Sequence, residues 1–427
     1  MVRTMGKGAV PEPGRLRLFY VVGTYPLLTT TFIDREIEML SEWEVDVAVI
    51  AMRRPDPTTP FTSRQEALAA RTTYLLPARK TTVLASHLYF AIRRPIRFWT
   101  TLLWLLTRPH PTLASRQKTL LHFGEGVLAS YLVRHREFEE FHAHFADRAA
   151  TVALVGGRLV GKPYSLSIHT GADIYVDSVL LAEKIQRARA VTTCTSYNRD
   201  HLGELLDRSH RPEIYHVRHG LDLSTYSPGM VSDGTPSTIL SVGQLKPRKG
   251  FAQLIRACAV LKQRGYDFQC RIIGEGPERP VLESLIADLD ISDVVELAGP
   301  RSQDDVLDEY RSATLFALPC VQTREGDVDG IPNVLAEAMA VELPVVSTDL
   351  PAITELVTPE VSGLLTAPDA LDALADALAR LLDDPPLRSR LGAAARAAVV
   401  ETFDLETNVR RFADNLWPGR IRVEVGA

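Results

Sequence analysis

Cysteine and long apolar runs are both scarce in this sequence, and each shortage excludes a class of protein. The four cysteines, Cys194, Cys258, Cys270 and Cys320, lack the short paired spacings of a zinc site. Three of them fall in or beside predicted strands, so we expect free thiols in the core and a reducing cytosol. The nearest approach to a membrane span, at 98–106, is too short to cross a bilayer, which needs about 20 residues.

A strong charge of either sign is also missing, and we expect no leader segment. The formal net charge is −5 and the pI is about 6.2, which offers no general basis for binding nucleic acid. Residues 1–13 include basic residues but no apolar core, so we expect no signal peptide. The chain has 427 residues, of which 45% are hydrophobic and 24% are charged, and this predicts a cytoplasmic globular protein of two or three domains.

Apolar strand patterns alternate with helical patterns in two runs. Strands of the first run are predicted at 17–22, 45–51, 164–168, 190–195 and 214–217. Those of the second run are predicted at 238–242, 270–273, 294–297, 314–318 and 344–347. Continuous apolar strands separated by helices predict an α/β fold, with parallel sheets covered on both faces and ligands beyond the carboxyl ends of the strands.

A polar segment rich in Pro, Gly and Ser separates the two runs. We therefore predict two doubly wound, Rossmann-like domains that face each other across a cleft. They occupy residues 1–222 and 238–404, with a linker at 223–237 and a tail at 405–427. Helices are predicted from the tract at 25–33 to about Trp43 and at 150–160, 197–206, 249–264 and 405–416, and Ser302 to Asp305 resembles a capping box.

The most informative stretch is 329–340, Asp-Gly-Ile-Pro-Asn-Val-Leu-Ala-Glu-Ala-Met-Ala, with an apolar strand close behind it. Pro332 suits the first position of a helix, and a helix start presents free backbone N–H groups that suit a phosphate. Asp329 and Glu337 would bracket that phosphate, and each carboxylate would accept hydrogen bonds from sugar hydroxyls. These features outline a nucleotide-sugar site.

This segment resembles the acidic–x7–acidic signature of the family 4 retaining glycosyltransferases (group 1 type), which have the two-domain GT-B fold. The resemblance implies that Asp329 contacts the donor hexose and that Glu337 contacts the donor ribose. The first acidic residue of the family is usually Glu. Asp329 is one methylene shorter, which bears on the choice of donor sugar more than on activity. The resemblance extends over nearly the whole chain and is most specific at 242–347.

The loop after the predicted strand at 238–242 carries Gly243 and, at its end, Arg248 and Lys249. A glycine turn followed by a basic residue that opens a helix suits a diphosphate. In the family, this Lys and an Arg at the position of Gln244 contact the donor phosphates, so the resemblance assigns that role to Lys249. Gln244 cannot supply the charge. Arg248 is a candidate substitute, although successive helix residues point about 100° apart.

The turn Gly-Glu-Gly-Pro contains Gly274 and Gly276, which would let the backbone approach a flat ring closely. The resemblance places this turn against the nucleobase. The residues predicted to bind the donor are therefore Glu337, Gly243, Gln244, Arg248, Gly274, Gly276, Gly330, Ile331, Pro332 and Asn333.

Histidines of the first half supply further candidates. His169 follows a predicted strand, so its imidazole would face the cleft. It resembles a family histidine that reaches the donor sugar, and Asp173 is a looser match in the same loop. His142 and His144 lie on one side of a strand, which favours structural hydrogen bonds over a metal site. His219 lies in a turn that resembles one near the hinge of the family, and we interpret it as structural.

Thr30 and Thr31 precede the first helix, where hydroxyls cap backbone N–H groups. The family often has Ser-Glu-Thr here, so Thr30 replaces the usual acid. With Asp173, these two threonines are the candidates for the acceptor side of the cleft.

Asp327-Val328-Asp329 mimics the Asp-x-Asp motif with which other glycosyltransferases hold a divalent metal. Its place inside the acidic signature favours sugar binding, so we predict no metal and no cofactor. The predicted catalytic residues are Lys249, Asp329 and His169, and a nucleotide-diphosphate sugar is the predicted donor. We identify no nucleophile, which suits attack by the acceptor on the side that the diphosphate leaves.

The sequence does not identify the acceptor. A glycan, a lipid-linked sugar and a small molecule stay open. Two other function classes stay open. A GT-B-shaped nucleotide-sugar epimerase would need acid/base carboxylates in the first half that we cannot place. A non-catalytic, glycosyltransferase-like binding partner is slightly favoured by the missing Arg at Gln244.

The helical stretch at 83–107 combines Trp and Phe with Arg93, Arg94 and Arg97, as membrane-surface helices do. Pro95 predicts a kink or a break into two helices. Two interpretations stay open for this stretch: a packing helix with its arginines in water, and a weak peripheral contact of residues 83–108 with the anionic surface of the inner membrane.

Overall fold

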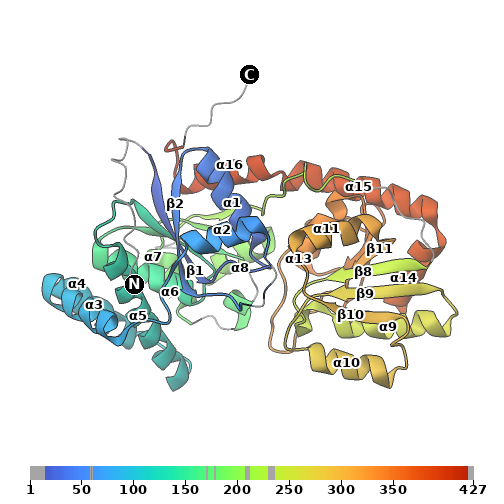
Figure 1. The fold of residues 1–427 in the computed structure, drawn as a ribbon, viewed down its shortest axis with the longest axis horizontal. Helices are drawn as coiled ribbons and strands as arrows, with labels where there is room; N and C mark the ends of the chain where they lie inside the picture. The colour runs from blue at the N-terminus through green and yellow to red at the C-terminus, as the bar shows by residue number, and fades with distance from the viewer. Residues whose placement is uncertain are drawn as a thin grey trace.

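The computed structural model describes residues 15–57, 59, 61–169, 172–176, 179–206, 212–228 and 236–421. The described chain forms two parallel sheets, each flanked by helices and lying in its own half of the molecule (Figure 1). The second sheet begins at Ser237, and part of the predicted linker, at 229–235, lies outside the described residues.

The first sheet has seven strands in the order β3-β2-β1-β4-β5-β6-β7, and every neighbouring pair is parallel. Its strands are β1 (Arg17–Thr24), β2 (Asp46–Arg53), β3 (Thr73–Tyr74), β4 (Glu140–His144), β5 (Tyr164–Ile168), β6 (Val191–Thr193) and β7 (Ile214–His216). Its helices are α1 (Thr31–Glu42), α2 (Ser63–Arg71), α3 (Lys80–Arg93), α4 (Pro95–Thr107), α5 (Leu113–Val133), α6 (Arg148–Val160), the π-helical turn η1 (Ala172–Val176), α7 (Leu181–Arg187) and α8 (Ser196–Glu204).

The second sheet has six parallel strands in the order β10-β9-β8-β11-β12-β13. Its strands are β8 (Ser237–Val242), β9 (Phe268–Ile273), β10 (Val295–Gly299), β11 (Leu315–Leu318), β12 (Val345–Thr348) and β13 (Leu364–Thr366). Its helices are the 3-10 turn η3 (Pro247–Lys249), α9 (Phe251–Gln263), α10 (Arg279–Asp288), α11 (Gln303–Ser312), α12 (Asn333–Ala340), α13 (Pro351–Thr354), α14 (Leu371–Asp383) and α15 (Pro385–Phe403), and α16 (Leu405–Leu416) follows.

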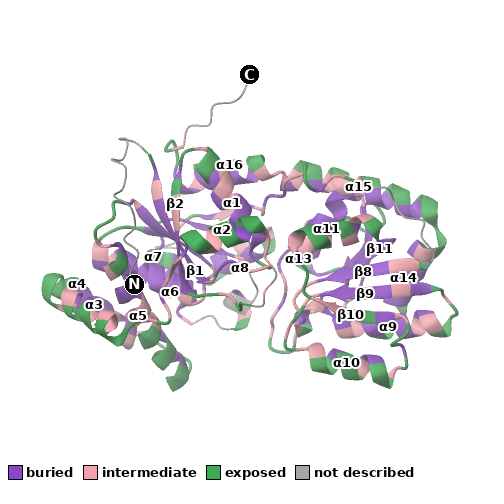
Figure 2. Cartoon of the chain, in the orientation of Figure 1, coloured by how far each residue is buried: buried purple, intermediate pink, exposed green. Residues whose placement is uncertain are grey.

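The strand order reverses once in each sheet, between β1 and β4 and between β8 and β11. At such a switch point the loops leave in opposite directions, and the crevice between them is where doubly wound sheets bind ligands. Both faces of each sheet are covered, so the central strands are almost wholly buried and the outer helix faces carry many of the exposed residues (Figure 2). Val21 and Leu240, in the centres of the two sheets, have no exposed surface.

The chain crosses between the two halves twice, and the two crossings lie side by side. The Leu221 amide donates to the Phe403 carbonyl (2.7 Å), and the Leu405 amide donates to the Leu221 carbonyl (3.1 Å). The α16 helix, with the bounds predicted for the tail helix, then packs against α1, and its Phe412 and Leu416 join the core of the first half (Figure 1). The last helix is therefore part of the first half.

Several local predictions are confirmed and two helix starts are corrected. The helical stretch breaks at Pro95 into α3 and α4, and Ser302 forms a capping box with Asp305. Pro332 is the N-cap of α12, and its first helical residue is Asn333. Lys249 ends the turn η3, and α9 begins only after Gly250.

Thr30 stands at the N-cap of α1, but its hydroxyl does not cap that helix. It donates to the Leu27 carbonyl (3.1 Å) and accepts from the Leu27 amide (3.0 Å), so it closes the preceding turn instead. The prediction of a capping threonine is therefore wrong for Thr30. Thr30 and Thr31 are both buried.

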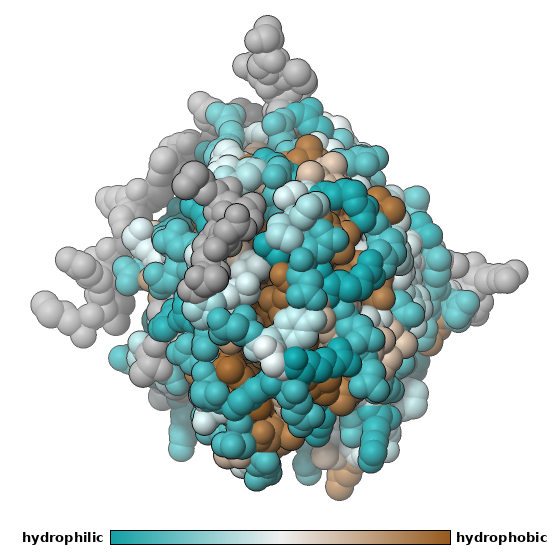
Figure 3. All heavy atoms as spheres, turned by 90° about the vertical axis from the view of Figure 1, so that its right-hand side faces the viewer, coloured by the Kyte–Doolittle hydropathy of each residue, from teal (hydrophilic) through white to brown (hydrophobic). Residues whose placement is uncertain are grey.

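The surface differs between the two ends of the molecule. The end formed by the second half is mostly hydrophilic, with apolar side chains in small groups (Figure 3). Large apolar residues with more than half of their surface exposed gather instead on α3 and α4 of the first half, as described below. No helix among the described residues combines the length and the apolar content that crossing a membrane requires.

Candidate active site

The loops at the switch point of the second sheet bring Lys249 and Asp329 together. The loop after β8 carries Arg248 and Lys249, and the loop after β11 carries Asp327 and Asp329. Because β8 and β11 are neighbours in the sheet, both loops leave the same edge at adjacent positions. The predicted phosphate-binding loop and the predicted sugar-binding carboxylate thus form one cluster.

This cluster is held by three short ion pairs. Asp329 accepts from Lys249 Nζ at its Oδ2 (2.6 Å) and from Arg248 Nε at its Oδ1 (2.7 Å). Arg248 Nη1 also reaches Asp327 Oδ2 (3.0 Å). Gly250 makes the geometry possible: its φ is +70°, and a Cβ there would come within 1.8 Å of the Pro319 carbonyl oxygen.

The ion pairs keep the cluster charged despite its burial. Burial by itself would raise the pKa of the Asp329 carboxyl, but Lys249 and Arg248 outweigh it and hold that pKa below its usual range. Burial likewise would lower the pKa of Arg248, and Asp329 and Asp327 raise it instead. Arg248 is therefore fully engaged by two carboxylates, which weakens its case as a substitute phosphate ligand for the charge missing at Gln244.

Gly274 and Gly276 pack against the phosphate-binding loop itself. A Cβ on Gly274, whose φ is +148°, would lie 1.9 Å from the Gly243 carbonyl oxygen. A Cβ on Gly276 would lie 2.4 Å from the carbonyl oxygen of Leu245. This contact between the two loops requires glycine at both positions, independently of any contact between the turn and a nucleobase.

Glu337 is buried between the two halves, with 6% of its surface exposed. Its Oε1 lies 3.5 Å from Arg35 Nη1, on α1 of the first half, and the Tyr310 hydroxyl donates to its Oε2 at 3.4 Å. Arg35 and Tyr310 were not among the predicted site residues. No local pattern singles out Arg35, because its partner lies in the other half of the sequence.

Three histidines continue this contact between the halves as an unbroken chain. His219 Nδ1 lies 2.8 Å from the Asn333 side-chain oxygen on α12, and His219 Nε2 lies 2.8 Å from His169 Nδ1. His169 Nε2 lies 3.0 Å from His144 Nδ1. His144 Nε2 faces the Glu36 carboxylate at 3.4 Å. The structure therefore connects His219 directly to the predicted site residues His169 and Asn333.

The side-chain oxygen of Asn333 determines the direction of this chain. That oxygen can only accept, so His219 donates to it from Nδ1 and accepts at Nε2. His169 then donates from Nδ1 and accepts at Nε2, and His144 donates from Nδ1.

Burial keeps the middle of the chain neutral. It lowers the pKa of His169 well below the usual range, and the neighbouring His219 and His144 lower it further. The pKa of His219 falls to about 4, chiefly through burial, although its hydrogen bond to Asn333 opposes the fall. The His219 ring also stacks on Phe32 at a centroid distance of 4.0 Å.

Gly330 lets the donor-side loop approach the first half closely. A Cβ at this position would come within 3.3 Å of the His169 carbonyl oxygen and 3.4 Å of Cys194 Sγ. Glu355, beyond α13, adds a second tie between the halves, because its carboxylate accepts from the backbone amides of Ser196 (3.0 Å) and Tyr197 (2.9 Å) at the start of α8. A narrow cavity beside His169 and His219 is lined by residues of the first half and of α16.

The acceptor-side candidates are described only in part. Asp173 lies in η1, and its side chain is outside the described part of the structure, as are the neighbouring residues 170 and 171. Thr30 makes its hydrogen bonds to Leu27, and Thr30 and Thr31 are both buried.

Two groups of side chains have the composition of a metal site. One comprises His169, Cys194 and His219, and the other comprises Glu36, His142 and His144. In the first group the facing ring nitrogens already form a hydrogen bond to each other, and burial raises the pKa of the Cys194 thiol to about 12. A metal there would have to break that bond and displace a firmly held proton.

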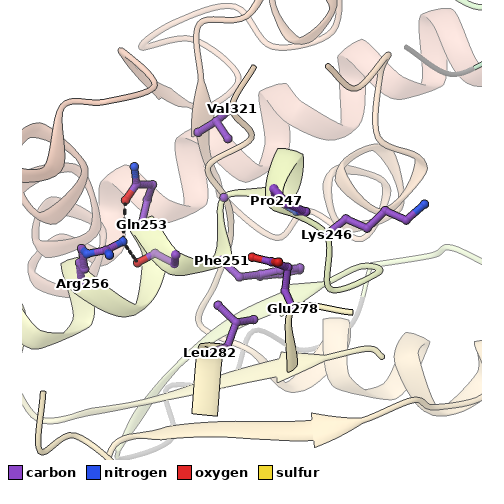
Figure 4. A pocket seen from close by; sticks show the side chains of 10 residues that line it. Lys246, Pro247, Phe251, Gln253, Arg256, Glu278, Leu282 and Val321 are labelled. Carbon is purple, nitrogen blue, oxygen red and sulfur yellow. Dashed lines mark hydrogen bonds between the residues drawn. The ribbon is translucent and has the colours of Figure 1, made fainter. Parts of the chain in front are cut away.

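A separate pocket is lined in part by residues of the phosphate-binding loop (Figure 4). The start of α9 and the first residues of α10 line it, with Lys246, Phe251, Glu278 and Leu282 around the opening. None of the residues predicted to bind the donor lines this pocket. It is therefore distinct from the Lys249–Asp329 cluster.

Comparisons with known proteins agree with this architecture. A model of the family "Glycosyl transferases group 1" matches residues 225–398. WcaL of Escherichia coli K12, assigned as a glycosyltransferase of colanic acid biosynthesis, is 31% identical over 363 residues, or 83% of this chain and 88% of that protein. A GDP-mannose-dependent phosphatidylinositol monomannoside mannosyltransferase of Mycolicibacterium smegmatis is 26% identical over 340 residues, or 76% of this chain and 84% of that one.

The solved structures extend the likeness over both halves. HepE of Anabaena, in complex with UDP-glucose, superposes with a TM-score of 0.69 at 15% identity, covering 94% of this chain and 99% of that one. At this identity the superposition shows the fold alone, and that fold is GT-B. Taken with the identity to WcaL over most of both chains, it establishes that the chain belongs to the group 1 glycosyl transferases.

Proposed function

We propose that the protein transfers a hexose, with retention of anomeric configuration, from a nucleotide-diphosphate sugar to an acceptor. The observation that carries this proposal is the Lys249–Asp329 cluster at the switch point of the second sheet, directly across from His169 of the first half. One site thus offers a cation that can bind the diphosphate of the donor and a carboxylate that can bind its sugar.

The proposed roles follow from charge. Lys249 and the backbone amides at the start of α12 stabilise the charge that builds on the departing diphosphate. Asp329 and His169 bind hexose hydroxyls, and Glu337 binds the ribose. Because Lys249 is paired with Asp329, donor binding exchanges this ion pair for a Lys249–phosphate contact and releases the carboxylate to the sugar. Transfer then proceeds by attack of the acceptor hydroxyl on the face that the diphosphate leaves.

We also propose that the reaction needs no metal and no cofactor. The two carboxylates of the Asp-x-Asp sequence are neutralised by Arg248 and Lys249, so the protein already supplies the cations that a divalent metal would bring. Neither relative named above is an epimerase, and nothing in the comparisons favours that alternative.

Incubation with a panel of UDP- and GDP-hexoses in water tests this proposal. Slow hydrolysis of one donor, followed by proton NMR, should release the sugar first as the anomer that the donor carried. Release of the opposite anomer would refute retention. Formation of an epimerised nucleotide sugar would instead identify an epimerase, and tight donor binding without turnover would identify a non-catalytic partner.

We further propose that α3 and α4 rest on the anionic, cytoplasmic face of a membrane, where a lipid-linked acceptor would be available. The exposed stripe of α3 consists of Leu84, Leu88 and Ile92, at intervals of four residues. That of α4 contains Ile96, Trp99 and Leu103, which are 78%, 57% and 62% exposed. These outward faces are visible along α3 and α4 in Figure 2.

Charge in this region complements an anionic surface. Between Glu66 and Glu125 the sequence contains nine Lys and Arg residues and no Asp or Glu, although the whole chain is net negative. Exposed Arg93, Arg94 and Arg97 border the apolar stripes. Apolar side chains that enter the interface, with cations beside the headgroups, are the features of a peripheral membrane helix.

Co-sedimentation with phosphatidylglycerol vesicles at low and high salt tests this contact. The wild type should sediment at low salt and be partly released at high salt. Trp99→Ser/Leu103→Ser should stay in the supernatant, whereas the matched control Val281→Ser/Val400→Ser, exposed apolar residues of the second half, should behave as the wild type does. A wild type that stays in the supernatant at low salt would refute the contact and favour a soluble acceptor.

A further inference from the structure

A pocket at the far end of the first sheet gathers positive charge around Trp104. Its lining includes Arg158 at the end of α6, Lys162 in the turn that follows, and Arg187 at the end of α7. The pocket also reaches Tyr164, the first residue of β5. It therefore lies at the amino ends of the strands, whereas the Lys249–Asp329 cluster and His169 lie at carboxyl ends.

Trp104, on α4, organises these cations. The Arg187 guanidinium lies 4.3 Å from the centre of the indole ring, that of Arg158 lies 5.4 Å away, and that of Arg108 lies 5.7 Å away. Such contacts hold guanidinium groups over an aromatic face without neutralising their charge. The indole ring thus holds three guanidinium groups close together although their positive charges repel each other.

The turn after α6 adds two more cations. The helix ends at Gly161, whose φ is +79°, and the amides of Gly161 and Lys162 both donate to the Gly157 carbonyl, at 2.8 and 3.0 Å. The Arg97 guanidinium lies next to Gly161, in the space that the Cβ of any other residue at position 161 would occupy. Lys162 lines the pocket, and Arg97 of α4 lies beside the turn that carries Lys162.

No carboxylate balances this charge within the described chain. Arg158 donates from Nε to the Thr101 hydroxyl (3.0 Å), and no described Asp or Glu forms an ion pair with Arg158, Lys162 or Arg187. Burial, and then the nearby Arg187, lowers the pKa of Arg158, as expected where like charges face each other. Arg158 is half-buried, whereas Lys162 and Arg187 are exposed. Arg248 and Arg271, which are likewise buried or half-buried, pair with carboxylates.

We infer that this pocket, made by Arg158, Lys162 and Arg187 around Trp104, binds the phosphate group of an anionic phospholipid. Guanidinium groups recognise phosphate oxygens through paired, charge-assisted hydrogen bonds, and an ammonium group adds a point charge. The inference rests on the proposed membrane contact, because Trp104 shares α4 with the exposed Ile96, Trp99 and Leu103. The pocket anchors the enzyme and takes no part in transfer.

Fluorine NMR of the full-length protein labelled with 5-fluorotryptophan reports on this pocket directly, with the Trp104 signal assigned by Trp104→Phe. The probes are dihexanoyl phosphatidylglycerol, dihexanoyl phosphatidylcholine and inorganic phosphate. Titration of the wild type with the phosphatidylglycerol should shift the Trp104 signal. The zwitterionic phosphatidylcholine should produce a smaller shift. Lys162→Gln/Arg187→Gln should weaken the affinity for the phosphatidylglycerol at least about tenfold, since each of the two cations contributes about fivefold near an anionic surface.

A matched control removes the same charge elsewhere. Arg256→Gln/Arg390→Gln, exposed cations of the second half, should respond as the wild type does. A wild type without a Trp104 shift, or a double variant at 162 and 187 that responds normally, would overturn the inference. A shift with inorganic phosphate and none with either lipid would overturn the lipid assignment and identify a free phosphate as the ligand.

Failure of the membrane proposal would look different. Trp99→Ser/Leu103→Ser should lose vesicle binding and keep the Trp104 response to the short-chain lipid, because these side chains are exposed to solvent and do not line the pocket. Conversely, Lys162→Gln/Arg187→Gln should still bind vesicles, through the apolar stripes and Arg93, Arg94 and Arg97, and should show a weaker preference for phosphatidylglycerol over phosphatidylcholine than the wild type does. Equal preference in the wild type and this variant would contradict the pocket while leaving the membrane contact intact.

Discussion

Replacing Lys249 by Met and, separately, Asp329 by Asn should change nucleotide binding in opposite directions. In the structure the Lys249 ammonium is held 2.6 Å from the Asp329 carboxylate, and both side chains are largely buried. Lys249→Met removes a proposed phosphate ligand. Asp329→Asn removes the anion that competes with phosphate for Lys249, and the amide oxygen can still accept from Arg248.

The magnitudes follow from the charge of the ligand. A charge-assisted hydrogen bond is worth about 1.5–3 kcal/mol, so Lys249→Met should weaken binding of UDP or GDP by about 10- to 100-fold. Asp329→Asn should leave nucleotide binding unchanged or tighten it. Sugar transfer should fall at least about 100-fold in Lys249→Met, or about 2.7 kcal/mol of transition-state stabilisation. Asp329→Asn should also transfer poorly, because the hexose loses its carboxylate.

Stability must be measured alongside, because the ion pair is buried. Removing one partner of a fully buried pair costs about 3–5 kcal/mol, but Arg248 still neutralises Asp329 in Lys249→Met. We therefore expect a loss of about 1–2 kcal/mol, which lowers the melting temperature by about 2–8 °C in a domain of this size. Binding should be measured by calorimetry well below that temperature.

Lys246→Met is the matched control, because Lys246 lies in the same loop and lines the separate pocket of Figure 4. It should bind the nucleotide nearly as the wild type does. Normal nucleotide binding by Lys249→Met would refute the phosphate role of Lys249. Equal weakening by Lys249→Met and Asp329→Asn would show instead that the intact ion pair shapes the loop.

The remaining predictions concern the metal, the missing arginine and the histidine chain. Transfer should persist in excess EDTA, and a loss that Mg²⁺ or Mn²⁺ reverses would show that Asp327 and Asp329 hold a metal. Gln244→Arg should preserve or tighten nucleotide binding, measured by calorimetry, because it adds a cation near the proposed diphosphate; abolished binding would assign Gln244 a role of its own. His219 has a pKa of about 4 when folded and about 6.5 when unfolded, so its stabilising contribution of about 3 kcal/mol is complete above pH 6.5 and is lost as the pH falls toward 4. Thermal melts between pH 7.5 and 4.5 should therefore fall more steeply in the wild type than in His219→Gln, and parallel curves would contradict this reasoning.

Local patterns in the sequence predicted the elements well, because each depends on residues close together in the chain. The strand at Tyr164–Ile168 and the helix at Leu405–Leu416 have the predicted bounds, and Ser302 and Asp305 form the predicted capping box. Proline chemistry likewise predicted the break between α3 and α4, since Pro95 lacks a backbone donor. The helix starts at Asn333 and Phe251 were misplaced by one or two residues, because the local geometry of Pro332 and Gly250 decided them.

The sequence alone also identified Asp329, Glu337, Lys249 and His169 as site residues, through motifs that are each contained in one loop. Which side chains they meet was decided only by the tertiary structure. Arg35 and Glu337 are 302 residues apart, and they meet because α16 and the paired crossings dock one half of the molecule on the other. The same docking joins His219 to Asn333 across the two halves. An ion pair or a hydrogen bond depends on distances of a few ångströms, and between residues so far apart in sequence only the packing of whole domains determines such distances.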